Sequence, residues 1–183
     1  MESIQTSLKV LRADLSKVKD DALLVGFFKD KLNLSSELKK LDDEFNGIVT
    51  SCIKDSNFKG EKGEVKNIYV NKNIKNIVLV GLGEENKFNL NILSNIVGDV
   101  SKRMRDNGSS SFSIYLNSFG NRKLKNDELV EKIALSSLMG LYKFIEYKTK
   151  NEDKIKNIKQ ITIITDSNNS FEKELKYASI VAY

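Results

Sequence analysis

Short apolar runs alternate with stretches of helical periodicity along the second half of this chain, and that order limits the folds it can adopt. Ile77–Val80 is an unbroken apolar run, and Ile161–Thr165 is another run rich in isoleucine and threonine. Strands buried on both faces have this composition, and they need helices on both sides of their sheet. The pattern predicts a three-layer α/β/α sandwich. Residues 112–117 alternate instead, which predicts a strand with one exposed face.

The stretches between these strands carry apolar residues at helical spacing. One helix is expected from Asn89, and Asn107-Gly108 would end it because both residues tolerate the left-handed conformation of a helix end. A second helix begins at Asp127, and a third begins near Ser167. Each helix is long enough to act as a right-handed crossover, so the strands that it joins are expected to be parallel.

The first half of the chain adds further strands, which follow one another at shorter intervals. Ala22–Phe28 predicts another buried strand, and Ile4–Leu11 predicts a looser one. Apolar residues recur at helical spacing over residues 36–53, which predicts a single helix there. Residues 65–70 predict a strand that pairs in a hairpin with a short neighbour at residues 56–59. The sheet is therefore expected to be mixed and largely parallel.

The absence of histidine from the whole sequence restricts the chemistry that this chain can perform. Ser-His-Asp and Cys-His mechanisms are excluded, as is every metal site that uses histidine. The only cysteine, Cys52, falls on the apolar face of its predicted helix and has no imidazole to activate its thiol, so we interpret it as a core residue. We therefore expect no catalytic, cofactor-binding or metal-binding residue in this chain.

Three pairs of neighbouring carboxylates, Asp20-Asp21, Asp42-Asp43 and Glu84-Glu85, are candidates for acid/base chemistry or a two-metal site. Neighbouring residues point to opposite faces of a strand, and on a helix they diverge by about 100°. Such pairs cannot easily share one site, so we interpret them as surface charge.

Gly81-Leu82-Gly83 follows the Ile77–Val80 run and precedes a helix, which is a position where backbone amides can bind a phosphate. The third glycine of a dinucleotide fingerprint is missing, and Glu84-Glu85 would repel a phosphate. We interpret the glycines as a tight turn in which side chains do not fit. Binding of ADP-ribose or another nucleotide at this loop stays open as an alternative.

The net charge of +5 invites a nucleic-acid interpretation, but the lysines are spread along the chain and arginine occurs only four times. Arginine dominates phosphate and base recognition, so a solvated lysine-rich surface is the favoured interpretation. Tyr142, Phe144 and Tyr147 lie among lysines and could instead stack on single-stranded nucleic acid. Packing of these aromatic residues against the sheet or a partner domain is the favoured alternative.

No apolar run approaches the roughly 20 residues that a membrane span needs, and the first residues lack the layout of a secretory signal. A cytoplasmic protein without a membrane partner is expected. The chain ends at Tyr183 inside a helical pattern that has no stop signal, which indicates continuation in a longer protein.

Three segments in order resemble one enzyme family. They are Asn76–Gly83 with the helix over residues 90–104, the stretch from Leu138 to Lys150, and the closing strand and helix over residues 161–183. The most specific of them contains Gly-Leu-Tyr-x-Phe-x-x-Tyr-Lys, here Gly140–Lys148. Together they resemble the N-terminal domain of the leucyl aminopeptidases (cytosol aminopeptidases, peptidase family M17), over nearly the whole chain.

The resemblance implies a macro-domain-like N-terminal domain over residues 1–166, and over residues 167–183 the start of a helix that links it to a larger catalytic domain. In that family the catalytic domain binds two divalent metals, usually zinc or manganese, and removes N-terminal amino acids from peptides. Its Asn-Thr-Asp-Ala-Glu-Gly-Arg signature is absent here, so no family site residue carries over. The expected partners are the chain's own catalytic domain and further copies in a hexamer. The expected role is assembly and control of access to the active site.

Overall fold

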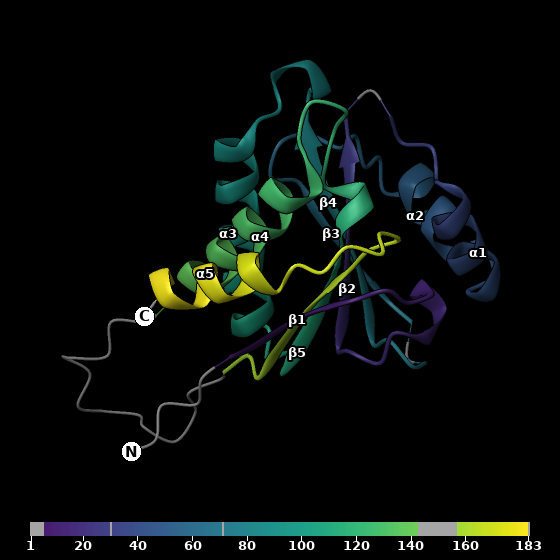
Figure 1. Ribbon diagram of the computed structural model, residues 1–183. Helices are drawn as coiled ribbons and strands as arrows, with labels where there is room; N and C mark the ends of the chain where they lie inside the picture. Colours follow the sequence, from purple (N-terminus) through teal and green to yellow (C-terminus); the bar gives the residue numbers. More distant parts are fainter. Residues whose placement is uncertain (1–5, 30, 71, 143–156, 183) are drawn as a thin grey trace, which may run out of the picture.

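A six-stranded sheet forms the centre of the molecule (Figure 1). The computed structural model describes residues 6–29, 31–70, 72–142 and 157–182. The strands lie in the order β1-β6-β5-β2-β4-β3, and every neighbouring pair is parallel except β3 and β4, which are antiparallel. The strand bounds are β1 Ser7–Leu11, β2 Ala22–Phe28, β3 Val65–Tyr69, β4 Asn76–Gly83, β5 Ser111–Tyr115 and β6 Gln160–Ile164. The mixed, largely parallel sheet predicted from the sequence is confirmed.

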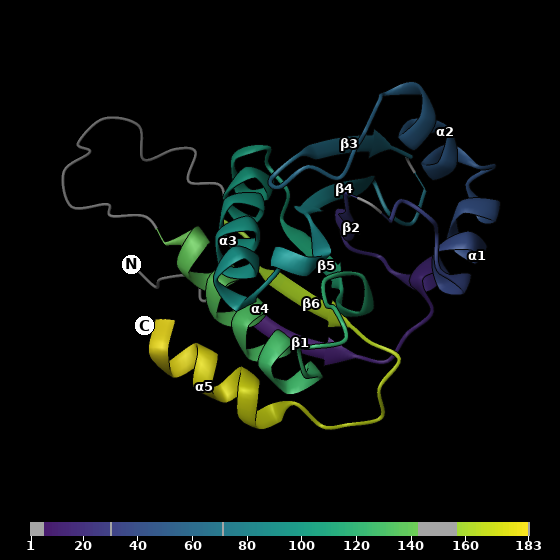
Figure 2. The same ribbon diagram turned by 90° about the horizontal axis from the view of Figure 1, so that it is seen from above.

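Helices cover both faces of this sheet, which confirms the predicted three layers (Figure 2). One face carries α3 (Leu90–Asp106), α4 (Asn126–Leu141) and α5 (Glu172–Ala182). The other carries α1 (Ser36–Glu44) and α2 (Ile48–Asp55). No helix among the described residues combines the length and apolar character that a membrane crossing requires.

The central strands β2 and β4 are buried on both faces because their side chains enter two separate cores. Leu24 and Val78 pack in the core beneath α3 and α4, whereas Leu23 and Leu79 pack in the core beneath α1 and α2. All four side chains are buried. An unbroken apolar run is what a strand between two helical layers requires.

The single helix predicted over residues 36–53 is wrong, since the chain breaks it into α1 and α2. Asn46 and Gly47 adopt left-handed conformations, with φ of 57° and 73°. The Asp42 carboxylate then accepts hydrogen bonds from the backbone N–H groups of Val49, at 2.7 Å, and Thr50, at 3.3 Å, at the start of α2. Apolar periodicity continues across the break, so it could not reveal the break.

The predicted hairpin between residues 56–59 and 65–70 is also wrong. β3 pairs with β4, with Val65 opposite Val80 and Tyr69 opposite Asn76, and residues 56–59 form no strand. The central strand β4 thus has a neighbour on each side, with β2 on the other. Pairing with a buried strand satisfies more backbone groups than a short exposed hairpin would.

The exposed face predicted for residues 112–117 is not present, because both faces of β5 are buried. Ser113 and Tyr115 are no more than 2 % exposed. Ser113 Oγ donates to the Asp20 carboxylate, which precedes β2. A polar residue at the alternating position here marks a buried hydrogen bond rather than contact with water.

Candidate functional site

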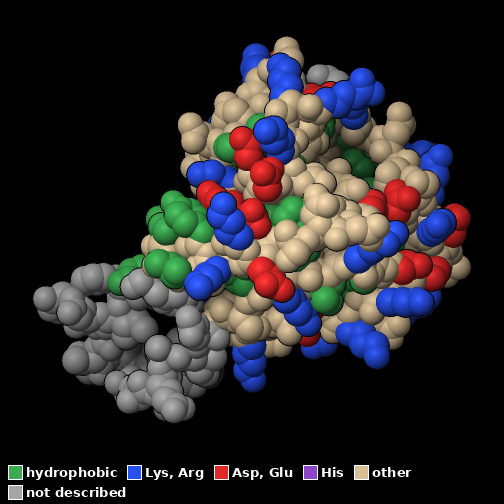
Figure 3. Space-filling model, viewed as in Figure 1, with side chains coloured by type: hydrophobic (Ala, Val, Ile, Leu, Met, Phe, Trp, Pro, Cys, Tyr) green, Lys and Arg blue, Asp and Glu red, His purple; other side chains and the backbone are tan. Residues whose placement is uncertain are grey.

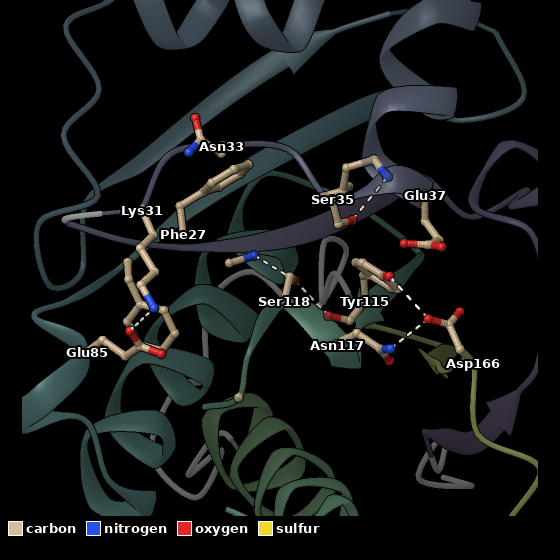
Figure 4. Close-up of a pocket in the computed structure, with 14 residues that line it drawn as sticks. Phe27, Lys31, Asn33, Ser35, Glu37, Glu85, Tyr115, Asn117, Ser118 and Asp166 are labelled. Atoms are coloured by element: carbon tan, nitrogen blue, oxygen red, sulfur yellow. Dashed lines mark hydrogen bonds and ion pairs between the residues drawn. The ribbon is translucent and has the colours of Figure 1, made fainter. Parts of the chain in front are cut away.

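A pocket opens at the carboxyl ends of β2 and β5. It has a volume of about 330 Å³. Its floor is Gly26–Phe28 of β2, one wall is Tyr115–Ser118 at the end of β5, and the opposite wall is the segment from Lys31 to the start of α1 (Figure 4). Asp166, just after β6, and Glu85, just after β4, complete it.

The topology of the sheet explains why a pocket lies here. From β2 the chain crosses to β3 and then β4 on one side, whereas from β5 it crosses to β6 on the other side. The loops that leave β2 and β5 therefore diverge, and ligand sites of open α/β sheets lie at such a point.

Ser118 occupies the base of this crevice. Its Oγ accepts a hydrogen bond from Gly26 N at 2.9 Å and donates to the Tyr115 carbonyl oxygen at 2.7 Å (Figure 4). A Cβ atom on residue 26 would lie 2.6 Å from the Ser118 carbonyl oxygen, so only glycine fits there. The loop after β5 is thereby held against β2.

Charged and polar side chains line the two ends of the pocket (Figure 4). At one end Lys31 Nζ forms an ion pair with Glu85 at 2.5 Å. At the other end Asp166 Oδ2 accepts from Asn117 Nδ2 at 2.6 Å and from the Tyr115 hydroxyl at 3.4 Å. Glu37, in the first turn of α1, lines the same pocket. The pocket thus contains three carboxylates and one ammonium group.

Tyr115 is the most perturbed titratable group in the pocket. Burial raises the pKa of its phenol well above the usual value, and the negative charge of Asp166 raises it further. The hydroxyl therefore stays protonated at physiological pH. It can donate a hydrogen bond and cannot serve as a base or a nucleophile.

The phosphate-binding loop considered at Gly81–Gly83 is contradicted by the structure, because these residues belong to strand β4. Gly81 N donates to Glu64 O at 2.7 Å, and Gly83 N donates to Gly60 O at 2.9 Å. A Cβ atom on residue 81 would lie 2.0 Å from Glu61 O. The glycines allow the segment before β3 to approach β4, so side chains do not fit, as predicted, but the reason is strand pairing rather than a turn.

The interpretation of the three carboxylate pairs as surface charge is wrong for Asp20 and Asp42, which are 9 % and 5 % exposed. Gln160 Nε2 and Ser113 Oγ donate to Asp20, while Asp42 caps α2. Glu84 and Glu85 form ion pairs with lysines, as surface carboxylates do. The two buried carboxylates serve as hydrogen-bond acceptors for the fold, and neither lines the pocket.

Asp21 connects the amino ends of three strands. Burial by itself would raise the pKa of its carboxyl, but hydrogen bonds from Lys75 and Ser110 outweigh burial and lower the pKa to about 2. Lys75 Nζ lies 2.6 Å from Asp21 Oδ1, and Ser110 N lies 2.7 Å from Oδ2. These contacts join residues that precede β2, β4 and β5.

The remaining candidates do not meet at one site. Cys52 is half-buried beside the core under α1 and α2, in agreement with its interpretation as a packing residue. Tyr142 is exposed just after α4, whereas Phe144 and Tyr147 lie outside the described residues. Within the part of the chain that the structure describes, no three His, Cys, Asp or Glu side chains gather closely enough to hold a metal ion.

Sequence reasoning missed the pocket as a unit, because its residues come from four separate strand ends. Asp166 and Asn117 carried one usable signal, since polar residues directly after buried parallel strands tend to share the same edge of a sheet.

Comparison with known proteins shows which proteins this chain is similar to. Residues 24–151 match the family described as "Cytosol aminopeptidase family, N-terminal domain". A probable cytosol aminopeptidase of Sulfurihydrogenibium sp. (strain YO3AOP1) is 32% identical over 148 residues, which cover 79% of this chain and 29% of that protein. The chain spans about a third of the length of the curated relatives it matches.

Solved structures with the same fold include an aminopeptidase and a macro domain. A mutant of tomato leucine aminopeptidase superposes with a TM-score of 0.80 at 17% identity, covering 99% of this chain and 37% of that one. The macro domain of ganglioside induced differentiation associated protein 2 superposes with a TM-score of 0.68 at 10% identity, covering 98% of this chain and 86% of that one. These likenesses establish a macro-domain-like fold. The match over residues 24–151 shows that the chain belongs to the cytosol aminopeptidase family, as its N-terminal domain.

Proposed function

We propose that this domain is a noncatalytic part of a leucyl-aminopeptidase-like metallo-exopeptidase, an enzyme that removes N-terminal amino acids from peptides. The observation that carries the proposal is the match of residues 24–151 to the N-terminal domain of the family, in a chain that spans about a third of its relatives' length. The chemistry of the parent enzyme is assigned to the part of the relatives that this chain does not span.

The two divalent metals that the family implies do not fit the side chains described here. Metal sites for zinc or manganese need several Asp, Glu, His or Cys ligands at one point. The described residues contain no such group of three. The proposal therefore places the zinc or manganese ions in the catalytic domain of the parent and gives this domain no step in peptide hydrolysis.

An apolar surface on α5 and the end of α4 supports a role in domain packing. Tyr177, Ile180 and Val181 are at least 50 % exposed and recur at helical spacing on α5, whereas Ala178 of the same helix is buried. Figure 3 shows hydrophobic side chains gathered over the carboxyl-terminal ends of these helices. A helix that is apolar on both sides is usually covered on both sides.

The proposed partners are therefore the chain's own catalytic domain, which would cover this surface, and further copies of the enzyme in a hexamer. In this arrangement α5 begins the link between the two domains, and residues 1–166 form the body of the N-terminal domain. The domain would shape access to the active site by its position. The description of its relatives as cytosol aminopeptidases supports a cytoplasmic location.

An activity assay tests the assignment of chemistry. The isolated chain is expected to release no p-nitroaniline from leucine p-nitroanilide, either with added Zn²⁺ or Mn²⁺ or with EDTA. The physical reason is that residues 6–29, 31–70, 72–142 and 157–182 contain no group of side chains that could hold a metal ion and so activate water. A full-length family member assayed alongside provides the positive control. Turnover by the pure chain that depends on added metal would contradict the proposal.

A further inference from the structure

The pocket at the ends of β2 and β5 offers little to an anion, because the chain's own oxygens already bind the amides beside it. Ser35 Oγ accepts from Leu38 N at 3.3 Å in the first turn of α1. The Glu37 carboxylate accepts from its own backbone N–H. Gly26 N is bound by Ser118 Oγ. A helix N-terminus attracts phosphate groups when its amides are free, and here a carboxylate of the helix holds that position.

The charge of the pocket also disfavours an anion. Its only lysine, Lys31, is already paired with Glu85. No lysine or arginine among the described residues forms an ion pair with Glu37 or Asp166, which lie toward the other end (Figure 4). A diphosphate would meet two carboxylates there, whereas a cation would be attracted.

Neutral oxygens accompany these carboxylates. The Tyr115 ring is 2 % exposed, and its hydroxyl lies in the pocket wall beside Asp166. Asp166 and Glu37 both lie at the Tyr115 end of the pocket (Figure 4). Asn117 and Ser35 add further oxygens to the same end. The described residues contain no group of three such side chains that could hold a metal ion, and the carboxylate and neutral oxygens at this end are acceptors suited to the several N–H donors of an organic cation.

We propose that this pocket binds a small organic cation, a ligand whose guanidinium group is held between Asp166 and Glu37. The volume of about 330 Å³ lies at the lower end of small-molecule sites and suits a ligand of amino-acid size. The site would give the domain a ligand of its own, separate from the peptide chemistry of the parent enzyme. It does not depend on the proposed role in domain packing.

Titration with L-arginine amide, followed by the backbone amide signals in two-dimensional NMR, tests this proposal on the chain itself. We expect saturable shifts at Gly26, Ser118 and Asp166 with a dissociation constant of about 1 mM or lower. L-Citrulline amide has nearly the same shape but carries a neutral urea group, and it should bind at least about threefold more weakly. ADP-ribose should cause no saturable shifts at these positions.

Two pocket variants and one control locate the site. Asp166→Asn keeps a hydrogen-bond acceptor but removes the charge, and it should weaken binding of L-arginine amide at least about threefold. Glu37→Gln should act in the same direction and serves as the test if the first variant does not fold. Glu84 pairs with Lys87 and does not line the pocket, so Glu84→Gln should leave binding of L-arginine amide unchanged. Equal binding of the arginine and citrulline amides, unchanged binding in both pocket variants, or tighter binding of ADP-ribose would each overturn the proposal.

Discussion

At the scale of single residues, close backbone approach explains several positions that the sequence pattern left unassigned. Gly140 begins the segment that most resembles the aminopeptidase family, and it lies where α4 crosses α3. The contact is lined by small residues, and Ser94 and Ser136 form a hydrogen bond of 2.8 Å across it. Small side chains bring the two helices together, so Gly140 serves packing rather than catalysis.

Replacing Gly140 by alanine is expected to lower the free energy of unfolding by about 2 kcal/mol. The added Cβ would lie 2.3 Å from the Gly98 carbonyl oxygen, so the helices must separate. Gly98→Ala is the matched control, because its Cβ would lie 3.6 Å from Ser136 O, an ordinary contact. That variant should be neutral or up to about 1 kcal/mol more stable, since alanine favours the helix. Urea denaturation measures both, and equal stabilities of the two variants would contradict this account.

At the scale of elements, the break between α1 and α2 shows how one buried carboxylate can divide a helical pattern. Asp42 lies in α1, yet its oxygens accept from Val49 N, Thr50 N and Thr50 Oγ1 in α2. The carboxylate therefore satisfies donors at the start of a new helix, where the preceding turn supplies no partner. Asn46 and Gly47 provide the left-handed turn that makes this contact possible.

Asp42→Ala is expected to lower the free energy of unfolding by about 2–3 kcal/mol, because buried N–H groups at the start of α2 would lose their acceptor. The neighbouring Asp43 is exposed, so Asp43→Ala should change the stability by less than about 0.5 kcal/mol. Thermal unfolding followed by circular dichroism compares the two variants. A wild-type melting curve for Asp42→Ala would show that the cap contributes nothing.

At the scale of the whole molecule, the exposed apolar side of α5 is the feature that the isolated domain leaves unexplained. Leu175 and Ala178 face α4 and the core, while Ile180 and Tyr177 face outward. Met139 and Tyr142 at the end of α4 extend the same apolar surface. A surface of this kind is what the proposed contact with the catalytic domain would cover.

In the full-length enzyme, the double variant Tyr177→Asp and Ile180→Asp is expected to lower the thermal unfolding midpoint by several degrees, since charges would be buried at the proposed domain contact. Lys40→Asp, exposed in α1 on the other face of the sheet, should leave the midpoint unchanged. Scanning calorimetry of the full-length enzyme and of the isolated domain, each carrying the same changes, separates loss of the domain contact from destabilisation of the domain itself. An equal loss in the isolated domain would contradict a role in domain packing.

The sequence by itself determined the class of fold, the positions of all six strands, the family and the ends of α3, because apolar runs and helix-ending residues are local properties. Only the tertiary structure decided which strand β3 pairs with, where the helix over residues 36–53 breaks, and why Ser113 is buried. Those outcomes depend on groups far along the chain, such as Val80 opposite Val65 and Asp20 beside Ser113. The pocket belongs to this second class, since it exists only where the ends of β2 and β5 diverge and Asp166 meets Tyr115.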